Sequence, residues 1–217
     1  MSIRWYLSYS LSYREVEELL LERGLSVDHS TIQRWVQRYS AELEQLFRKK
    51  HKRRRPYISW RLDETYIKIK GKWVYLYRAV DKGGDTIDFM LSDTRDEQAA
   101  FAFLKKAIGS HDLPQKINID KSGANDAAII YLNCLLFLAG LWPHAWVEDR
   151  QIKYLNNMVE QDHRHIKRRT NPMLGFKSWD SAESTIAGYE LINMLRKGQF
   201  ENAGNMAVFE QFYAIAA

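Results

Sequence analysis

The sequence has few of the features that mark secreted or membrane proteins. Cys134 is the only cysteine among 217 residues, which excludes an internal disulfide and a cysteine-based zinc cluster and favours a reducing compartment. The longest apolar run, Ala127 to Trp142, is interrupted by Asn133 and falls short of the ~20 residues that cross a bilayer; we predict a buried helix there. Serines break up the segment after Arg4, which argues against a signal peptide. We expect a cytoplasmic protein without a membrane partner.

The composition also excludes a disordered chain. A hydrophobic fraction of 46% and an aromatic fraction of 13% are sufficient for a packed core. The length allows one sizeable core and a small appendage, because domains typically run to ~100–150 residues.

Positive charge is concentrated in one segment. Residues 48–55 carry seven positive charges, and without them the formal net charge of +5 falls to −2. Such a segment favours binding to a phosphate backbone, which releases counterions; the alternative is a solvated linker without a partner. The residues of this run predicted to contact DNA are Lys49, Lys50, Lys52, Arg53, Arg54 and Arg55.

The residues before the basic run have the pattern of a helix-turn-helix module. Apolar residues at three- and four-residue steps predict an amphipathic helix over 12–23, with Gly24 as its C-cap. Ser30 is the expected cap of a second helix over 31–39, which buries Ile32, Trp35 and Val36. Its opposite face offers side chains that read base edges and hold phosphates, although an ordinary helical hairpin fits too. These side chains are Thr31, Gln33, Arg34, Gln37 and Arg38.

After Pro56 the pattern changes to strands and then to an alternation of strands and helices. Aromatic and β-branched residues predict strands over 57–69, 73–80 and 86–91. Helices are expected over 97–108, 124–138, 157–169 and 182–196, and strands over 116–120 and 145–147. This order is that of an α/β, RNase H-like catalytic domain with a mixed five-stranded sheet and flanking helices. We therefore divide the chain into a helix-turn-helix module (1–47), a basic linker (48–56), the catalytic domain (57–200) and a C-terminal tail (201–217).

Three carboxylates stand where this strand order makes them converge. Asp63 lies in the first strand, Asp120 ends the fourth, and Glu160 lies on the helix after the fifth. Asp63 and Asp120 sit among apolar strand residues, where an unpaired carboxylate is costly. Glu64 is the alternative candidate to Asp63, but strand alternation turns it to the opposite face. Asp162 is the alternative candidate to Glu160.

The helix that carries Glu160 also carries basic residues. His163, Arg164 and Lys167 follow Glu160 by three, four and seven positions, which places them on one helical face. Together with Arg168 they are expected to hold the DNA backbone at the scissile phosphate. The alternative is a solvated helix stabilised by pairs four residues apart.

Hard oxygen ligands of this kind suit Mg²⁺, which completes its octahedron with water and phosphate oxygens. Two such ions ~3.5–4 Å apart activate the attacking oxygen and stabilise the leaving oxygen of an in-line displacement. We expect two Mg²⁺ ions, with Mn²⁺ able to substitute.

At these residues the chain resembles the DDE transposases of bacterial insertion sequences, specifically the insertion sequence six family. The motifs that carry the resemblance include Leu11-Ser12-Tyr13-Arg14-Glu15, Asp63-Glu64-Thr65-Tyr66, Tyr75-Leu76-Tyr77-Arg78-Ala79-Val80-Asp81, Asn157 with Glu160 and Asp162-His163, and Leu174-Gly175-Phe176-Lys177-Ser178. The resemblance implies that Asp63, Asp120 and Glu160 are the DDE triad and that Lys167 is the basic residue that accompanies it.

The resemblance also implies an activity and its partners. It implies binding to the terminal inverted repeats of the element, cleavage of the 3′ ends and transfer of the freed 3′-OH to target DNA. The protein is then expected to act on double-stranded DNA as a homo-oligomer, in association with the nucleoid. Two alternatives are a DNA-binding regulator without catalysis, which retention of all three carboxylates disfavours, and an RNase H-like nuclease, which has less need of a helix-turn-helix.

Overall fold

The computed structural model describes residues 1–53 and 58–215, which belong to two compact units. One unit comprises Met1–Arg54 and His165–Ala217, and the other comprises Arg55–Arg164. This division differs from the domain boundaries expected from sequence, because the residues after 164 group with the N-terminal helices. None of the helices in the described part of the chain is both long and apolar enough to cross a membrane.

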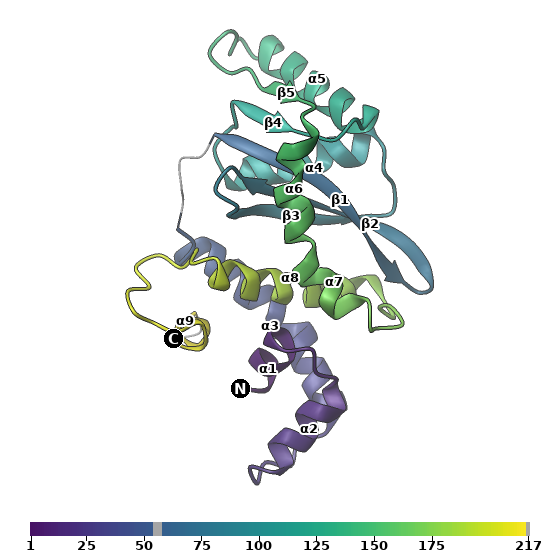
Figure 1. Cartoon of the computed structure of the whole chain (residues 1–217), viewed down its shortest axis with the longest axis vertical. Coiled ribbons are helices and arrows are strands. Elements are labelled where there is room, and N and C mark those ends of the chain that lie inside the picture. The colour runs from purple at the N-terminus through teal and green to yellow at the C-terminus, as the bar shows by residue number, and fades with distance from the viewer. Residues whose placement is uncertain (54–57, 216–217) are drawn as a thin grey trace. The chain divides into compact units, whose positions relative to one another are not determined.

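The first unit is helical (Figure 1). Its helices are α1 (Ser2–Ser8), α2 (Tyr13–Leu21), α3 (His29–Lys50), α7 (Arg164–Thr170), α8 (Trp179–Arg196) and α9 (Val208–Ala214). Helix α8 packs against α3, and this contact explains why the C-terminal segment joins the N-terminal helices. The packing of α1 on α8 is also close, since a Cβ atom on Gly188 would lie 2.6 Å from Leu7 Cδ2.

The two helices predicted near the amino terminus are present, with different limits. Ser12 caps α2 and forms a capping box with Glu15. The cap of α3 is Asp28 rather than Ser30, because the Asp28 side chain accepts the Ser30 backbone N–H at 2.8 Å. Helix α3 then continues to Lys50, well beyond the expected end, so the start of the basic run is its last turn. Helices α1 and α9 are additional to the expected elements.

The second unit is built on a five-stranded sheet whose order is β3-β2-β1-β4-β5. The strands are β1 (Ser59–Ile69), β2 (Lys72–Asp81), β3 (Thr86–Ser92), β4 (Lys116–Asn118) and β5 (Glu148–Arg150). β1, β2 and β3 form an antiparallel meander, whereas β4 lies parallel to β1 and β5 parallel to β4. The RNase H-like order expected from sequence is therefore confirmed, including the pairing of the first and fourth strands.

The β1–β2 hairpin closes through a two-residue turn. Lys70 and Gly71 have φ angles of 50° and 80°, the left-handed pair that matches the twist of a tight hairpin. This turn fixes the register in which Asp63 stands opposite Arg78.

Helices cover both faces of the sheet (Figure 1). α4 (Glu97–Ser110) and α5 (Gly123–Leu138) bury the main apolar cluster against one face, with Trp60 and Leu62 of β1 at its centre. α6 (Lys153–Asp162) packs across β1 and β2. Because neighbouring residues of a strand point to opposite faces, Asp63 lies on the side of α6.

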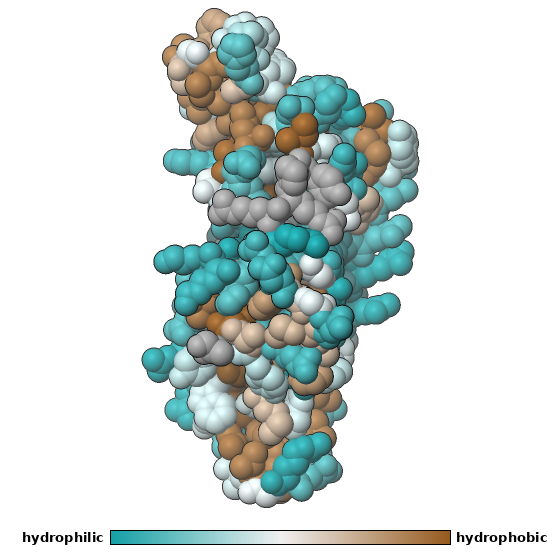
Figure 2. Space-filling model, turned by 90° about the vertical axis from the view of Figure 1, so that its left-hand side faces the viewer, coloured by the Kyte–Doolittle hydropathy of each residue, from teal (hydrophilic) through white to brown (hydrophobic). Residues whose placement is uncertain are grey.

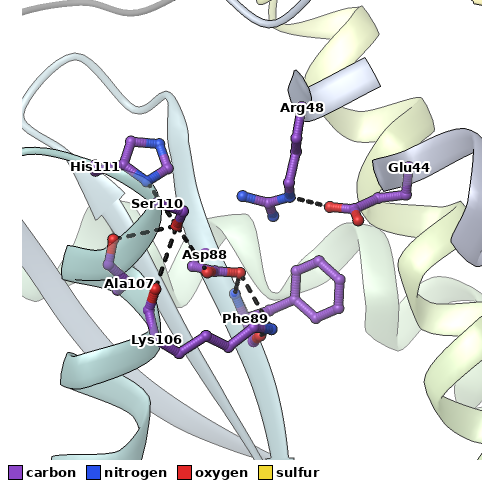
Figure 3. A network of polar contacts seen from close by, with 8 residues as sticks. All are labelled: Glu44, Arg48, Asp88, Phe89, Lys106, Ala107, Ser110 and His111. Carbon is purple, nitrogen blue, oxygen red and sulfur yellow. Dashed lines mark hydrogen bonds and ion pairs between the residues drawn. The ribbon is translucent and has the colours of Figure 1, made fainter. Parts of the chain in front are cut away.

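Polar contacts hold α4 against the edge strand β3, as Figure 3 shows. Lys106 donates to the Phe89 carbonyl at 2.6 Å and lies 3.4 Å from Asp88, and the Ser110 hydroxyl donates to Asp88 at 3.3 Å. The same figure shows, in the helical unit, the ion pair of Arg48 with Glu44 one turn earlier on α3.

Two expected elements are placed differently. The fifth strand is Glu148–Arg150 rather than 145–147, because the Asn133 side-chain amide bonds both the N–H and the C=O of Val147, at 2.9 and 2.8 Å. The helix expected over 157–169 is two helices, α6 and α7, which meet at His163. The helical face assumed to run from Glu160 to Lys167 is therefore interrupted.

The expectation that Ala127–Trp142 forms a buried helix is only half right. Ile129 on α5 is 1% exposed and packs in the core, but its neighbour Ile130 is 56% exposed and Leu138 is 79% exposed. Apolar residues therefore reach the surface, and they gather at the upper end of Figure 2, where Figure 1 places α5. The absence of charge in this segment reflects an exposed apolar face as well as a buried one.

Candidate active site

Two of the predicted carboxylates meet because β1 and β4 are parallel neighbours. Asn118 of β4 pairs with Arg61 of β1, so Asp120, two residues beyond β4, comes level with Asp63. Carboxylate oxygens of Asp63, Glu64 and Asp120 all lie within 4.8 Å of one another. The expected approach of Asp63 to Asp120 is therefore present in the structure, but the third member of the tight group is Glu64 rather than Glu160.

Glu160 reaches the same region from α6. Glu160 and Asp120 line one pocket of about 250 Å³, together with Ile119, Lys121, Gln151, Lys153 and Asn156. Glu160 is exposed and lies outside the tight group of Asp63, Glu64 and Asp120, although its charge is among those that raise the pKa of Asp63.

Two sets of contacts hold α6 against the sheet. The Asn118 side chain donates to Asn156 Oδ1 at 2.5 Å and exchanges hydrogen bonds with the backbone of Ile152. At the other end of α6, Arg78 Nη2 lies 2.6 Å from Asp162 Oδ2, with the Arg78 side chain 1% exposed. Asp162, which the sequence offered as the alternative to Glu160, therefore forms an ion pair with the buried Arg78.

Glu64 does point to the opposite face, as strand alternation predicts, yet its carboxylate remains part of the acidic group. Asn125 Nδ2, in the first turn of α5, donates to Glu64 Oε1 at 2.9 Å. Arg95 Nη2 lies 3.3 Å from Glu64 Oε2 and 3.1 Å from Asp120 Oδ2. Alternation therefore does not remove Glu64 from the electrostatics of the site.

The environment disfavours ionisation of Asp63. Burial is the largest cause, and the nearby charges of Glu64, Asp120 and Glu160 add to it, which together raise the pKa of Asp63 to about 7. Burial also raises the pKa of Glu64, against the opposing effect of Arg95. A divalent cation would relieve both the desolvation and the repulsion.

We expect the contribution of Asp63 to the stability of the metal-free protein to fall as pH rises from about 4 to about 7. Over this interval folded Asp63 keeps a proton that the unfolded chain releases near the ordinary pKa of 3.8. Below pH 4 Asp63 is protonated in both the folded and the unfolded state. Above pH 7 it is ionised in both, and the destabilisation of the folded state by the buried charge, roughly 4 kcal/mol at most, is fully present. Urea unfolding in chelator should show Asp63→Asn gaining stability relative to wild type as pH rises. A constant difference between the two proteins over this range would contradict the shifted pKa.

The residues fit a divalent metal ion. Their donor atoms are carboxylate oxygens, which Mg²⁺ and Mn²⁺ prefer. Asp120 Oδ1 is buried and has no hydrogen-bond partner among the described residues, and a buried carboxylate oxygen is costly when left unsatisfied. The tight group of Asp63, Glu64 and Asp120 could hold such an ion, and Glu160 lines the pocket beside Asp120.

The basic residues predicted beside Glu160 divide between the two compact units. His163 is 3% exposed, and its Nδ1 atom lies 3.9 Å from Asp63 Oδ2, so it is a buried neighbour of the site rather than an accessible DNA contact. Arg164 is exposed. Lys167 and Arg168 belong to α7 in the helical unit, and their predicted roles stay predictions.

On α3 the structure separates the candidate DNA contacts by exposure. Arg34 and Arg38 are exposed. Gln37 instead donates to the Ser181 hydroxyl of α8 at 3.0 Å, and Trp35, expected in the buried stripe, is 36% exposed. The other two candidates on this helix are partly exposed, namely Thr31 and Gln33.

The basic run is not uniformly a solvated linker. Its two exposed lysines in the last turn of α3 are Lys49 and Lys50. Lys52 is only 8% exposed and forms an isolated bridge with Phe200, and the Arg53 backbone N–H donates to the Gln199 carbonyl at 2.8 Å. Lys52 is thus a poor candidate for DNA contact. Two further members of the run lie outside the described residues, namely Arg54 and Arg55.

Sequence reasoning missed Arg78, Arg95 and Asn125. A signal existed for Arg78, since an arginine amid the apolar residues of β2 requires a buried partner. The loop position of Arg95 is that of an ordinary solvated cation, and only the tertiary structure brings it to the carboxylates.

An RNase H-like sheet with carboxylates on β1, after β4 and on α6 defines the class of metal-dependent polynucleotidyl transferases. Residues 57–199 match the family described as a DDE domain, of the IS240 type. The chain belongs to this family of DDE transposases and, as the sequence resemblance implies, to the insertion sequence six group.

Relatives from Staphylococcus aureus support this membership. The chain is 44% identical over 197 residues to the transposase for insertion sequence-like element IS431mec, spanning 91% of this chain and 83% of the relative. The transposase for insertion sequence element IS257 in transposon Tn4003 matches with the same identity and coverage. Among solved structures, the HTLV-2 integrase catalytic core domain in complex with magnesium is 18% identical and covers 75% of this chain and 97% of that domain, with a TM-score of 0.46.

Proposed function

We propose that this DDE transposase binds the terminal inverted repeats of its insertion sequence, cleaves the 3′ ends and joins the freed 3′-OH to target DNA. The observation that carries the proposal is that Asp120 lies beside Asp63 and shares a pocket with Glu160, while its buried Oδ1 atom has no hydrogen-bond partner among the residues that the structure describes. A noncatalytic regulator has no need of such an arrangement.

The proposed chemistry uses Asp63, Asp120 and Glu160 as the ligands of two Mg²⁺ ions, with Mn²⁺ as a substitute. When bound, the two ions supply activation of the attacking oxygen and stabilisation of the leaving oxygen. The carboxylates of β1 and the β4 end fix one side of the site, and α6 brings Glu160 from the other. Lys121 and Lys153 line the same pocket and are suited to hold the phosphodiester backbone.

End recognition is assigned to the helical unit. Arg34 and Arg38 project from α3 into solvent, and the helix ends on the exposed Lys49 and Lys50. This pattern fits a helix that enters the major groove while basic residues contact phosphates. We propose that the protein acts on two element ends as a homo-oligomer.

The test is a strand-cleavage assay with purified full-length protein, Mg²⁺ and a labelled duplex that ends in the inverted repeat of the element. The expected products are a nick that leaves a 3′-OH at the element end and, with a target duplex present, a joined strand. Binding of the duplex without either product would favour a regulator, and nicking without joining would favour a nuclease. Either result contradicts the proposal.

A further inference from the structure

Arg95 connects two carboxylates of the candidate site. It lies in the loop between β3 and α4, immediately before Asp96, which caps α4. A single guanidinium nitrogen, Nη2, lies 3.3 Å from Glu64 Oε2 and 3.1 Å from Asp120 Oδ2. Its side chain is 34% exposed, so the loop leaves the guanidinium accessible from solvent.

The two carboxylates that Arg95 contacts differ in exposure and in hydrogen bonding. The Glu64 side chain is 3% exposed and both its oxygens are used, Oε1 by Asn125 and Oε2 by Arg95. The Asp120 side chain is 43% exposed, and only its Oδ2 faces Arg95 while Oδ1 has no hydrogen-bond partner in the described residues. Glu64 is therefore an anchor for Arg95, whereas Asp120 is available to another ligand.

We propose that Arg95 is a built-in counter-ion of the metal site, which pairs with Asp120 until a divalent cation displaces it and which then remains on Glu64. This inference rests on the proposed function, in which Asp120 is a metal ligand. It assigns Glu64 the role of an anchor for Arg95 and leaves Asp63, Asp120 and Glu160 to bind metal. Arginine suits this role because it stays charged throughout the accessible pH range, so it leaves Asp120 by displacement rather than by deprotonation.

The proposal predicts the sign of an affinity change. The contact of Arg95 with Asp120 stabilises the metal-free site and competes with the metal ion, so its removal should tighten metal binding. A purely structural role for Arg95 predicts the opposite sign, because a loosened β3–α4 loop would leave Asp120 less well placed and would weaken binding.

The experiment is a calorimetric titration of the metal-free, full-length protein with Mn²⁺ alone, without DNA. Arg95→Gln should bind Mn²⁺ about 3- to 10-fold more tightly than wild type, the range expected for loss of one partly exposed ion pair. Its melting temperature in chelator should be lower than that of wild type. Arg95→Lys, which keeps the charge, should remain within about twofold of wild type. Unchanged or weaker binding by a folded Arg95→Gln protein would overturn the proposal.

Glu64→Gln provides an independent test through a double-mutant cycle. Without its anchor, Arg95 would pair with Asp120 alone, so Glu64→Gln should weaken Mn²⁺ binding. In the Arg95→Gln background the same substitution should weaken Mn²⁺ binding less than it does in the wild-type background, because only the direct effect of the Glu64 charge then remains. If Glu64 were itself a metal ligand, the loss would persist undiminished in that background, and this outcome would contradict the proposal.

Asp120→Asn separates failure of this proposal from failure of the metal site. If Asp120→Asn weakens Mn²⁺ binding while Arg95→Gln does not tighten it, the counter-ion proposal alone is wrong. If Asp120→Asn leaves Mn²⁺ binding unchanged, the assignment of Asp120 as a ligand fails, and the counter-ion proposal fails with it.

Discussion

Asp120→Asn should reduce metal-dependent cleavage of inverted-repeat DNA by at least about 10³-fold while leaving DNA affinity nearly unchanged. The substitution keeps the size of the side chain and an oxygen that can accept from Arg95, but it removes the negative charge that a divalent cation needs. DNA affinity should persist because the residues proposed to recognise the ends, Arg34 and Arg38, belong to the other compact unit.

Asp112→Asn is the matched control for this prediction. Asp112 is exposed in the segment before β4, so the same change of charge should leave cleavage within about twofold of wild type. Both proteins should be assayed with Mg²⁺ and with Mn²⁺, and circular dichroism should confirm that both are folded. Wild-type cleavage by a folded Asp120→Asn protein would exclude Asp120 from the catalytic site.

Asp162→Asn should destabilise the protein, by about 3–5 kcal/mol at most, because it removes a negative charge that faces the buried Arg78 guanidinium. The Arg78 side chain is 1% exposed and Asp162 is 12% exposed, so water cannot readily replace the lost partner. The pair joins β2 to the end of α6, and its loss should also loosen the helix that carries Glu160. Urea unfolding of the metal-free protein measures the effect.

A surface pair provides the comparison. Glu148 lies 3.0 Å from Lys116 and 2.9 Å from Arg150, but the three side chains are 47%, 36% and 34% exposed, so Glu148→Gln should cost no more than about 1 kcal/mol. Similar small losses for Asp162→Asn and Glu148→Gln would show that α6 is held by other contacts.

The sheet could be predicted from sequence because its signals are local. The Lys70-Gly71 turn, the alternating residues of β1 and the order of strands and helices together indicate that β1 and β4 are neighbours, and this adjacency brings Asp63 to Asp120. The end of helix α6 could not be predicted in the same way. No local pattern marks the end of α6 at His163, and a continuous 3.6-residue period therefore placed Lys167 on the face of Glu160.

The parts of the site that sequence could not supply depend on tertiary contacts between distant residues. Strand alternation turned Glu64 to the other face correctly, but a long side chain there still meets Arg95 from the β3–α4 loop and Asn125 from α5. In the same way, Asn133 takes the backbone bonds of Val147 that a strand would otherwise use. The apolar run around Leu138 was predicted to be buried because hydrophobicity indicates burial only on average.

The central claim is that Asp63, Asp120 and Glu160 bind the divalent ions that cleave DNA, and a crystal structure of the full-length protein with Mn²⁺ and an inverted-repeat duplex tests it most directly. Anomalous scattering should place manganese about 2 Å from carboxylate oxygens of Asp63 and Asp120, with Glu160 completing the protein ligands. Manganese bound elsewhere, or absent from these carboxylates in protein that cleaves the same DNA, would contradict the account.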